Sequence, residues 1–199
     1  MSDGLATLAK IESECMGTVG VLYTPWRFGT AMALKKTSDI IAISFELDES
    51  ALNTFTQETI NLSLDPLNNE VFVVVAVDLD VGAPSGLAGA NTQSEMALTT
   101  TSKTGMPNLS DSQCLARSQI KFQGAGFLDY SAVVITRSPE TPVGNLDYIG
   151  IVATNNVFVQ VKGANNVGTI GGSGRMWGYR ARADVGTYSA LIQSEVLSA

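Results

Sequence analysis

The sequence of 199 residues contains no histidine. Histidine is the usual proton shuttle at neutral pH and a common nitrogen ligand for zinc, copper and iron. Its absence excludes Ser-His-Asp triads, Cys-His dyads and histidine-bound metals. The serines also lack the Gly-x-Ser-x-Gly frame of many hydrolases. We therefore expect that the chain is not an enzyme and carries no cofactor.

Charged residues are also few, at 16% of the chain, and most of them are acidic. The 19 acidic and 12 basic side chains give a net charge of −7. A chain with this balance repels a phosphate backbone, so we expect no strong nucleic-acid binding through bulk charge.

Cysteines and long apolar runs are scarce as well. Cys15 and Cys114 lie far apart and form no Cys-x-x-Cys pair, which predicts two buried free thiols in a reducing cytoplasm. The longest apolar run, Val71–Val77, is much shorter than the roughly 20 residues that span a bilayer. Charges interrupt the first 16 positions, so neither a signal peptide nor a transmembrane segment is expected.

Period-two patterning of apolar residues dominates what is present. Ile41, Ile43, Phe45 and Leu47 alternate with polar or small residues, as in a half-buried strand. The valine-rich run 70–79 indicates a strand that is buried on both faces. Ten strands are predicted in this way, over residues 41–48, 60–64, 70–79, 95–101, 119–122, 129–136, 146–154, 157–162, 175–183 and 187–196.

The connections carry their own signals. Asn155-Asn156 predicts a type I′ turn, and therefore a hairpin, because asparagine tolerates positive φ. Longer loops rich in small residues or proline are expected at 80–94, 102–112 and 137–145, and a glycine-rich loop at 163–174. Many short strands with regular turns predict an all-β fold, an antiparallel β-sandwich over residues 18–199.

The first 17 residues differ from the rest of the chain. Ser2 or Asp3 can cap a helix over residues 2–16 that Gly17 ends, and Leu5 and Leu8 give it a thin apolar stripe. Such a stripe suits a helical arm, residues 1–17, that lies on a sheet or on a neighbouring subunit. We expect the longest helix of the chain to be this one.

Two acidic clusters are candidate cation sites. Asp78 and Asp80 lie at i and i+2 beyond an apolar strand and share one face, so together with loop oxygens they could bind calcium. Glu46, Asp48 and Glu49 form a similar cluster. Both lack the Asp-x-Asp-x-Asp-Gly pattern of calcium loops, and solvated strand ends are the simpler interpretation.

Basic and aromatic residues mark candidate interfaces. Arg175, Arg180 and Arg182 lie within eight positions, close to Trp177, and residues of these types are enriched at interfaces. A solvated strand face is the alternative. A second cluster follows the arm and could anchor it in a pocket, or could pack in the core: Tyr23, Trp26 and Phe28.

The whole layout resembles a viral coat protein of the single jelly-roll type: an apolar, histidine-free chain with an N-terminal arm, about ten strands and long small-residue loops. The resemblance implies a capsid subunit that self-assembles into a large homo-oligomer, contacts itself and other virion proteins, and is made in the host cytoplasm. One departure concerns the arm, where Lys10 is the sole basic residue before Gly17, so genome contact through the arm is not expected.

Other interpretations stay open. A phage tail-tube subunit, or another β-sandwich that forms rings or filaments, has similar size, acidity and loops. A cellular β-sandwich that binds carbohydrate or protein is a third possibility. Assembly separates these classes, because a binding module is expected to remain a monomer.

Overall fold

The computed structural model describes residues 34–124, 133–137 and 146–197. The chain divides into residues 1–31 and a compact unit of residues 32–199, and the architecture below is that of the second unit. The predicted arm helix, and with it the longest predicted helix, lies outside the described residues.

The described residues are mostly β-structure, as predicted. Ten strands, one short 3-10 helix and one α-helix follow in chain order: β1 Lys35–Lys36, β2 Ile41–Asp48, β3 Thr56–Asn61, η1 Pro66–Asn68, β4 Glu70–Val81, β5 Asn91–Thr99, β6 Cys114–Gln123, β7 Val133–Arg137, β8 Gly150–Val152, β9 Asn156–Ala164, β10 Gly171–Arg182 and α2 Val185–Leu197.

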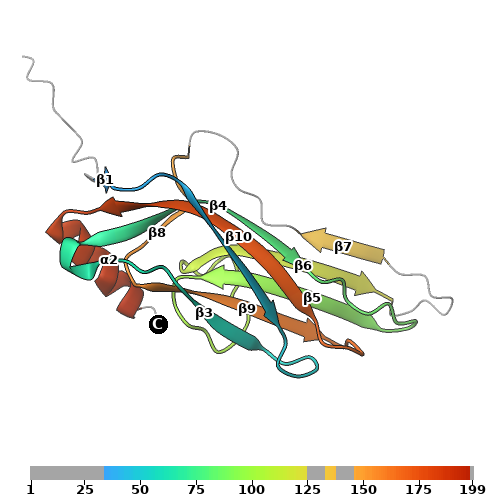
Figure 1. Ribbon diagram of the computed structural model, residues 1–199. Coiled ribbons are helices and arrows are strands. Elements are labelled where there is room, and N and C mark those ends of the chain that lie inside the picture. The colour runs from blue at the N-terminus through green and yellow to red at the C-terminus, as the bar shows by residue number, and fades with distance from the viewer. Residues whose placement is uncertain (1–33, 125–132, 138–145, 198–199) are drawn as a thin grey trace, which may run out of the picture. The chain divides into compact units, whose positions relative to one another are not determined.

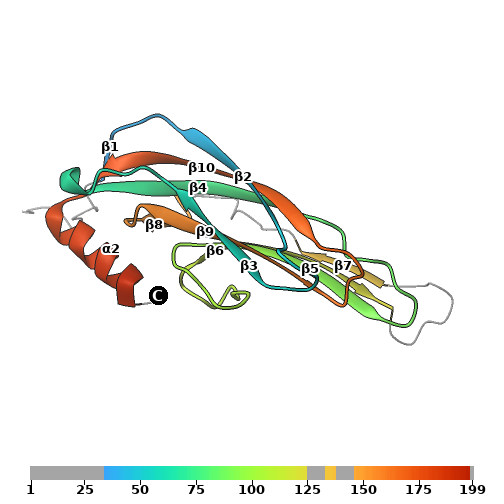
Figure 2. The same ribbon diagram turned by 60° about the horizontal axis from the view of Figure 1, so that its bottom comes forward.

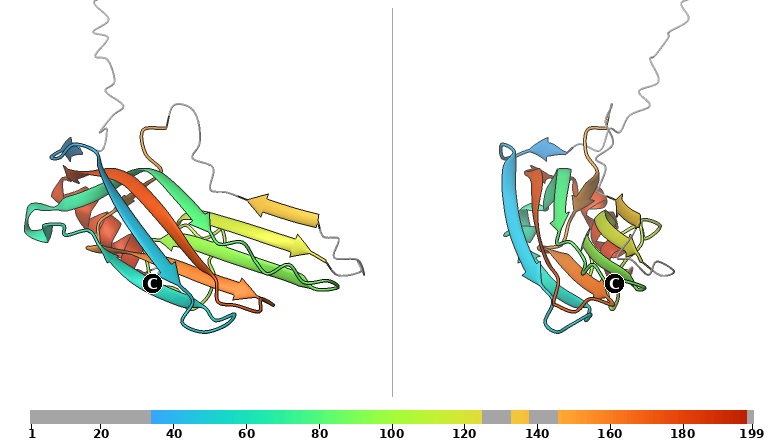
Figure 3. Two further views of the ribbon diagram at one scale, coloured as in Figure 1. Left: turned by 45° about the vertical axis from the view of Figure 1, so that its right-hand side comes forward. Right: turned by 90° about the vertical axis from the view of Figure 1, so that its right-hand side faces the viewer.

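The strands form two antiparallel sheets that lie as two layers (Figures 1 and 3). Sheet A has the order β1-β10-β4-β8, and β2 also pairs with β10. Sheet B has the order β3-β9-β5-β6-β7. Several strands that lie side by side in a sheet are distant in sequence. In sheet A, β10 pairs with β2 and β4, and in sheet B, β9 pairs with β3 and β5.

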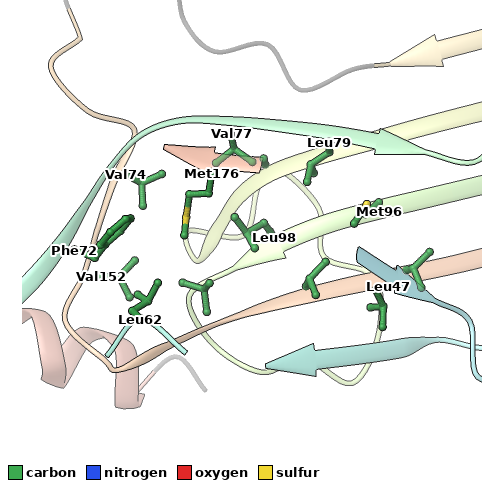
Figure 4. Close-up of a cluster of buried hydrophobic side chains, with 14 of the residues drawn as sticks. Leu47, Leu62, Phe72, Val74, Val77, Leu79, Met96, Leu98, Val152 and Met176 are labelled. Atoms are coloured by element: carbon green, nitrogen blue, oxygen red, sulfur yellow. The ribbon is translucent and has the colours of Figure 1, made fainter. Parts of the chain in front are cut away.

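The main core lies between the two sheets and follows from the pleat of the strands. Leu47, Val77 and Met176 point inward from sheet A, and Met96 and Leu98 from sheet B (Figure 4). Met96, Leu98 and Met176 are completely buried. Because successive side chains point to opposite faces, the residues between these positions point away from the core.

The first part of β4 is buried on both faces, and a bulge changes which of its residues point inward. Ala76 pairs with Trp177 and Val74 with Gly178, so Val75 is an extra residue in β4. Because of it, the even-numbered residues point into the main core before the bulge and the odd-numbered residues after it. Before the bulge, Val71 and Val73 point to the other side of sheet A, where α2 covers them (Figure 2). After the bulge, every second residue of β4 is exposed.

The predicted strand over residues 187–196 is wrong, because this segment is the helix α2. The Asp184 carboxylate caps the helix, accepting from the Thr187 amide at 3.0 Å and from its hydroxyl at 2.6 Å. Both hydrogen bonds hold the pKa of Asp184 below its usual value. Tyr188, Leu191 and Ile192 follow at helical spacing and pack against sheet A.

The predicted hairpin at Asn155-Asn156 is also wrong, because β8 belongs to sheet A and β9 to sheet B. The chain crosses between the layers here. Asn155 accepts hydrogen bonds from the amides of Leu62, through its carbonyl at 2.8 Å, and Leu64, through its side chain at 2.6 Å. Neither asparagine is among the described residues with positive φ, so the turn type that favours asparagine is not used.

Half of the glycine-rich loop predicted at 163–174 is strand. β9 continues to Ala164 and β10 begins at Gly171, which leaves six connecting residues, 165–170. A side chain at Gly174 would collide with the Phe45 ring, so glycine here permits close packing of β10 on β2. The strand predicted at 60–64 is shifted, since β3 ends at Asn61.

Candidate interaction surface

Four of the five residues in the two predicted acidic clusters lie on one face of sheet A: Glu46, Asp48, Asp78 and Asp80. The fifth, Glu49, is not a solvated strand-end residue, because its carboxylate is buried and accepts hydrogen bonds from the backbone amides of Gly163 and Ile170. β10 pairs with β2 on one side and with β4 on the other, so Ser173 lies between Glu46 and Asp80. Arg175 lies in the same way between Ser44 and Asp78. All of these side chains point away from the main core, and we call this surface the acidic face: Ser44, Glu46, Asp48, Asp78, Asp80, Ser173, Arg175 and Trp177.

An open depression of about 460 Å³ lies on the acidic face and includes three of its carboxylates, Glu46, Asp78 and Asp80. Its one cationic lining residue is Arg175, which donates from Nε to the Ser44 hydroxyl at 3.1 Å. The Arg175 guanidinium lies 5.9 Å from the centre of the Trp177 ring, within cation–π range. The depression therefore combines negative charge with a half-buried aromatic side chain.

The carboxylates of the acidic face form no ion pair, with Arg175 or with any other side chain, in the part of the chain that the structure describes. The ion pairs found there are Lys103–Asp111 and Arg117–Glu95, both at 2.8 Å and both elsewhere. Asp78 and Asp80 share an outward face, as their spacing predicts. Across residues 34–124, 133–137 and 146–197, no three acidic or cysteine side chains gather closely enough to hold a metal ion.

The three candidate arginines do not form one patch. Arg180 and Arg182 point to the side of β10 opposite Arg175 and Trp177. Arg180 donates to the Leu62 carbonyl at 3.1 Å, and Arg182 donates to the Asn68 side chain at 3.0 Å. Both therefore tie β10 to the segment between β3 and β4, which is a structural role.

The remaining candidate interface residues lie outside the described residues: Leu5, Leu8, Tyr23, Trp26 and Phe28. The same holds for the arm over residues 1–17 and for Cys15. Their predicted roles stay predictions.

A second surface, which sequence reasoning missed, lies on β7 at the edge of sheet B. Val133, Val134 and Ile135 are 50%, 58% and 42% exposed. The sequence predicts a strand at 129–136 but gives no sign that it is an edge strand. An exposed apolar edge strand is a template for association, because its free backbone groups and side chains can pair with another chain.

The outer face of sheet B also contains a buried polar cluster. The Glu95 carboxylate, 6% exposed, pairs with Arg117 and accepts from the side-chain amides of Gln93 and Gln119. The Arg117 guanidinium neutralises the single acidic residue of β5, β6 and β9. Their effect is structural, since all partners come from β5 and β6.

The loop between β5 and β6 contacts β3, where the Lys103 backbone amide donates to the Gln57 side chain at 2.8 Å. Its Lys103 binds Asp111 and holds the pKa of that carboxyl below its usual value. Cys114 is a free, half-buried thiol, and burial raises its pKa. Ser118 and Lys121 have the Ser-x-x-Lys spacing, but on a strand they point to opposite faces and cannot act together.

Comparisons with known proteins place the chain in no family. No protein-family model matches the sequence, and no significant match to a curated protein is found. Among the described residues, no helix has the length and apolar character needed to cross a membrane.

Proposed function

We propose that the chain is a structural subunit of a virion shell, built on a jelly roll, and not an enzyme. The observation that carries the proposal is the exposed apolar edge strand β7, together with an open sheet face rich in charge. An isolated, stable domain usually protects its sheet edges with charge, proline or a covering element. Among its described residues, β7 has three adjacent apolar side chains that face solvent. A neighbouring subunit would cover them.

The pairing pattern of the strands supports the jelly roll. This fold contains eight strands in two sheets and follows from rolling up one long hairpin, in which the first strand pairs with the last and so on inward. With β1 and β7 set aside, the strands pair as β2–β10, β3–β9, β4–β8 and β5–β6. Rolling such a ribbon also places β10 beside β4 and β9 beside β5, as observed.

A jelly roll is found in viral capsids and also in lectins and other binding proteins, so the fold alone does not select the function. The exposed apolar edge favours the assembling class, because a monomeric binding module gains nothing from it. In the proposed role the chain is made in the host cytoplasm and contacts copies of itself and other virion proteins.

The test is direct imaging of the purified full-length chain by negative-stain microscopy, with light scattering to measure its mass. Closed shells are the expected result. Rings or tubes would favour a filament-forming subunit, and a monomer at high concentration would favour a binding module and overturn the proposal. A variant that lacks residues 1–17 should remain folded by circular dichroism but should fail to form normal shells.

A further inference from the structure

We infer that the acidic face of one copy binds the outer face of the β6–β7 edge of a second copy, in a heterologous contact. This inference rests on the proposed assembly, and it names the two surfaces that meet.

The acidic face is unbalanced in charge. Glu46, Asp48, Asp78 and Asp80 are all exposed, and Arg175 is the one basic side chain beside them on β2, β4 and β10 that faces the same way. Along the same face, Trp177 is flanked by the small residues Ala42 and Ala76 of the neighbouring strands. One end of the surface therefore consists of an aromatic ring between two small side chains, and the other end is negatively charged.

The outer face of the β6–β7 edge has the opposite charge. Lys121 of β6 pairs with Ile135 of β7, so both point outward, and Val133 points to the same side. Lys162 of β9 is exposed on this face two strands away. Because Arg117 neutralises Glu95, the face keeps its positive charge. We call this surface the basic edge: Lys121, Lys162, Val133 and Ile135.

The two surfaces complement each other in two ways. Lysines can meet carboxylates, and the exposed Val133 and Ile135 can meet Trp177 and its flanking alanines. Neither surface is complementary to itself, since two acidic faces or two basic edges would repel. A contact between unlike surfaces of identical subunits is heterologous, and it continues from copy to copy into a closed ring or a larger array. A second copy of this chain is therefore the occupant that both surfaces fit.

Charge reversal tests the inference. Asp78→Lys with Asp80→Lys gives a chain with two basic surfaces, and Lys121→Glu with Lys162→Glu gives one with two acidic surfaces. Since like charges across an interface cost several kcal/mol, each variant alone should need an about 100-fold higher concentration to associate. An equimolar mixture should associate again, because each junction then joins opposite charges. Sedimentation velocity measures all three samples.

The matched control reverses two exposed carboxylates that belong to neither surface, Asp39→Lys with Glu58→Lys, which changes the net charge by the same amount as the Asp78/Asp80 variant. This control should associate like the original chain. If the original chain associates and the Asp78/Asp80 variant does so equally well, or if the mixture shows no rescue, the inferred contact is wrong while the shell proposal stands. If the original chain itself stays monomeric, the shell proposal fails first.

Discussion

Replacing Glu195 by alanine should destabilise the domain by about 3 kcal/mol. This carboxylate is 4% exposed and accepts two hydrogen bonds of 2.9 Å, from the amides of Ala153 and Thr154. Truncation leaves both amides without a partner, and each buried, unsatisfied group costs about 1–3 kcal/mol. The lower half of the summed range applies, because Thr154 is half-buried and water can reach it.

Urea unfolding followed by circular dichroism measures this change through the shift of the midpoint at constant slope. Glu195→Gln keeps one acceptor oxygen and should lose less than the alanine variant. Gln193→Ala, at an exposed position of the same helix, serves as the control and should stay within about 0.5 kcal/mol of the original. These two hydrogen bonds hold α2 to the segment in which the chain passes from β8 to β9. A loss below about 0.5 kcal/mol for Glu195→Ala would refute this role of the carboxylate.

Two further predictions concern packing and thiol chemistry. Gly178→Ala should destabilise by at least about 2 kcal/mol, because the added methyl collides with the phenylalanine ring and a backbone carbonyl of β4, whereas Gly168→Ala meets open space and serves as the control in thermal unfolding. With the other cysteine replaced by serine, Cys114 should react with iodoacetamide more slowly than free cysteine at pH 8, since its raised pKa lowers the thiolate fraction. Unfolding in urea should remove this difference, and equal rates in the folded protein would contradict the burial argument.

Sequence patterning predicts most of the strands of this fold and fails where a tertiary contact decides. Alternation identifies β2, and the valine run identifies β4, since both patterns arise from the pleat itself. The segment after Asp184 has apolar residues compatible with either period, and what selects the helix is its packing against Val71 and Val73 on the outer face of sheet A. The pair Asn155-Asn156 has turn chemistry, yet backbone groups after β3 bind Asn155 and guide the chain into the other sheet.

The candidate surfaces show the same division. Spacing alone predicts that Asp78 and Asp80 share a face, and it also predicts that Arg180 and Arg182 do. It does not reveal that β10 lies between β2 and β4. The sequence therefore does not predict that Glu46 and Asp80 lie on either side of Ser173. The exposure of β7 is equally hidden, because edge position depends on the order of strands in the sheet.

The central place of β10 in sheet A has a consequence for biosynthesis. β2 and β4 do not pair with each other, and both wait for β10, which begins at Gly171. On a ribosome, which adds residues from the N-terminus, sheet A cannot close until this late segment has left the exit tunnel. The acidic face therefore does not exist on a nascent chain from which β10 has not yet emerged. Nascent copies that lie side by side on a polysome lack one half of the inferred contact until then, which delays their association.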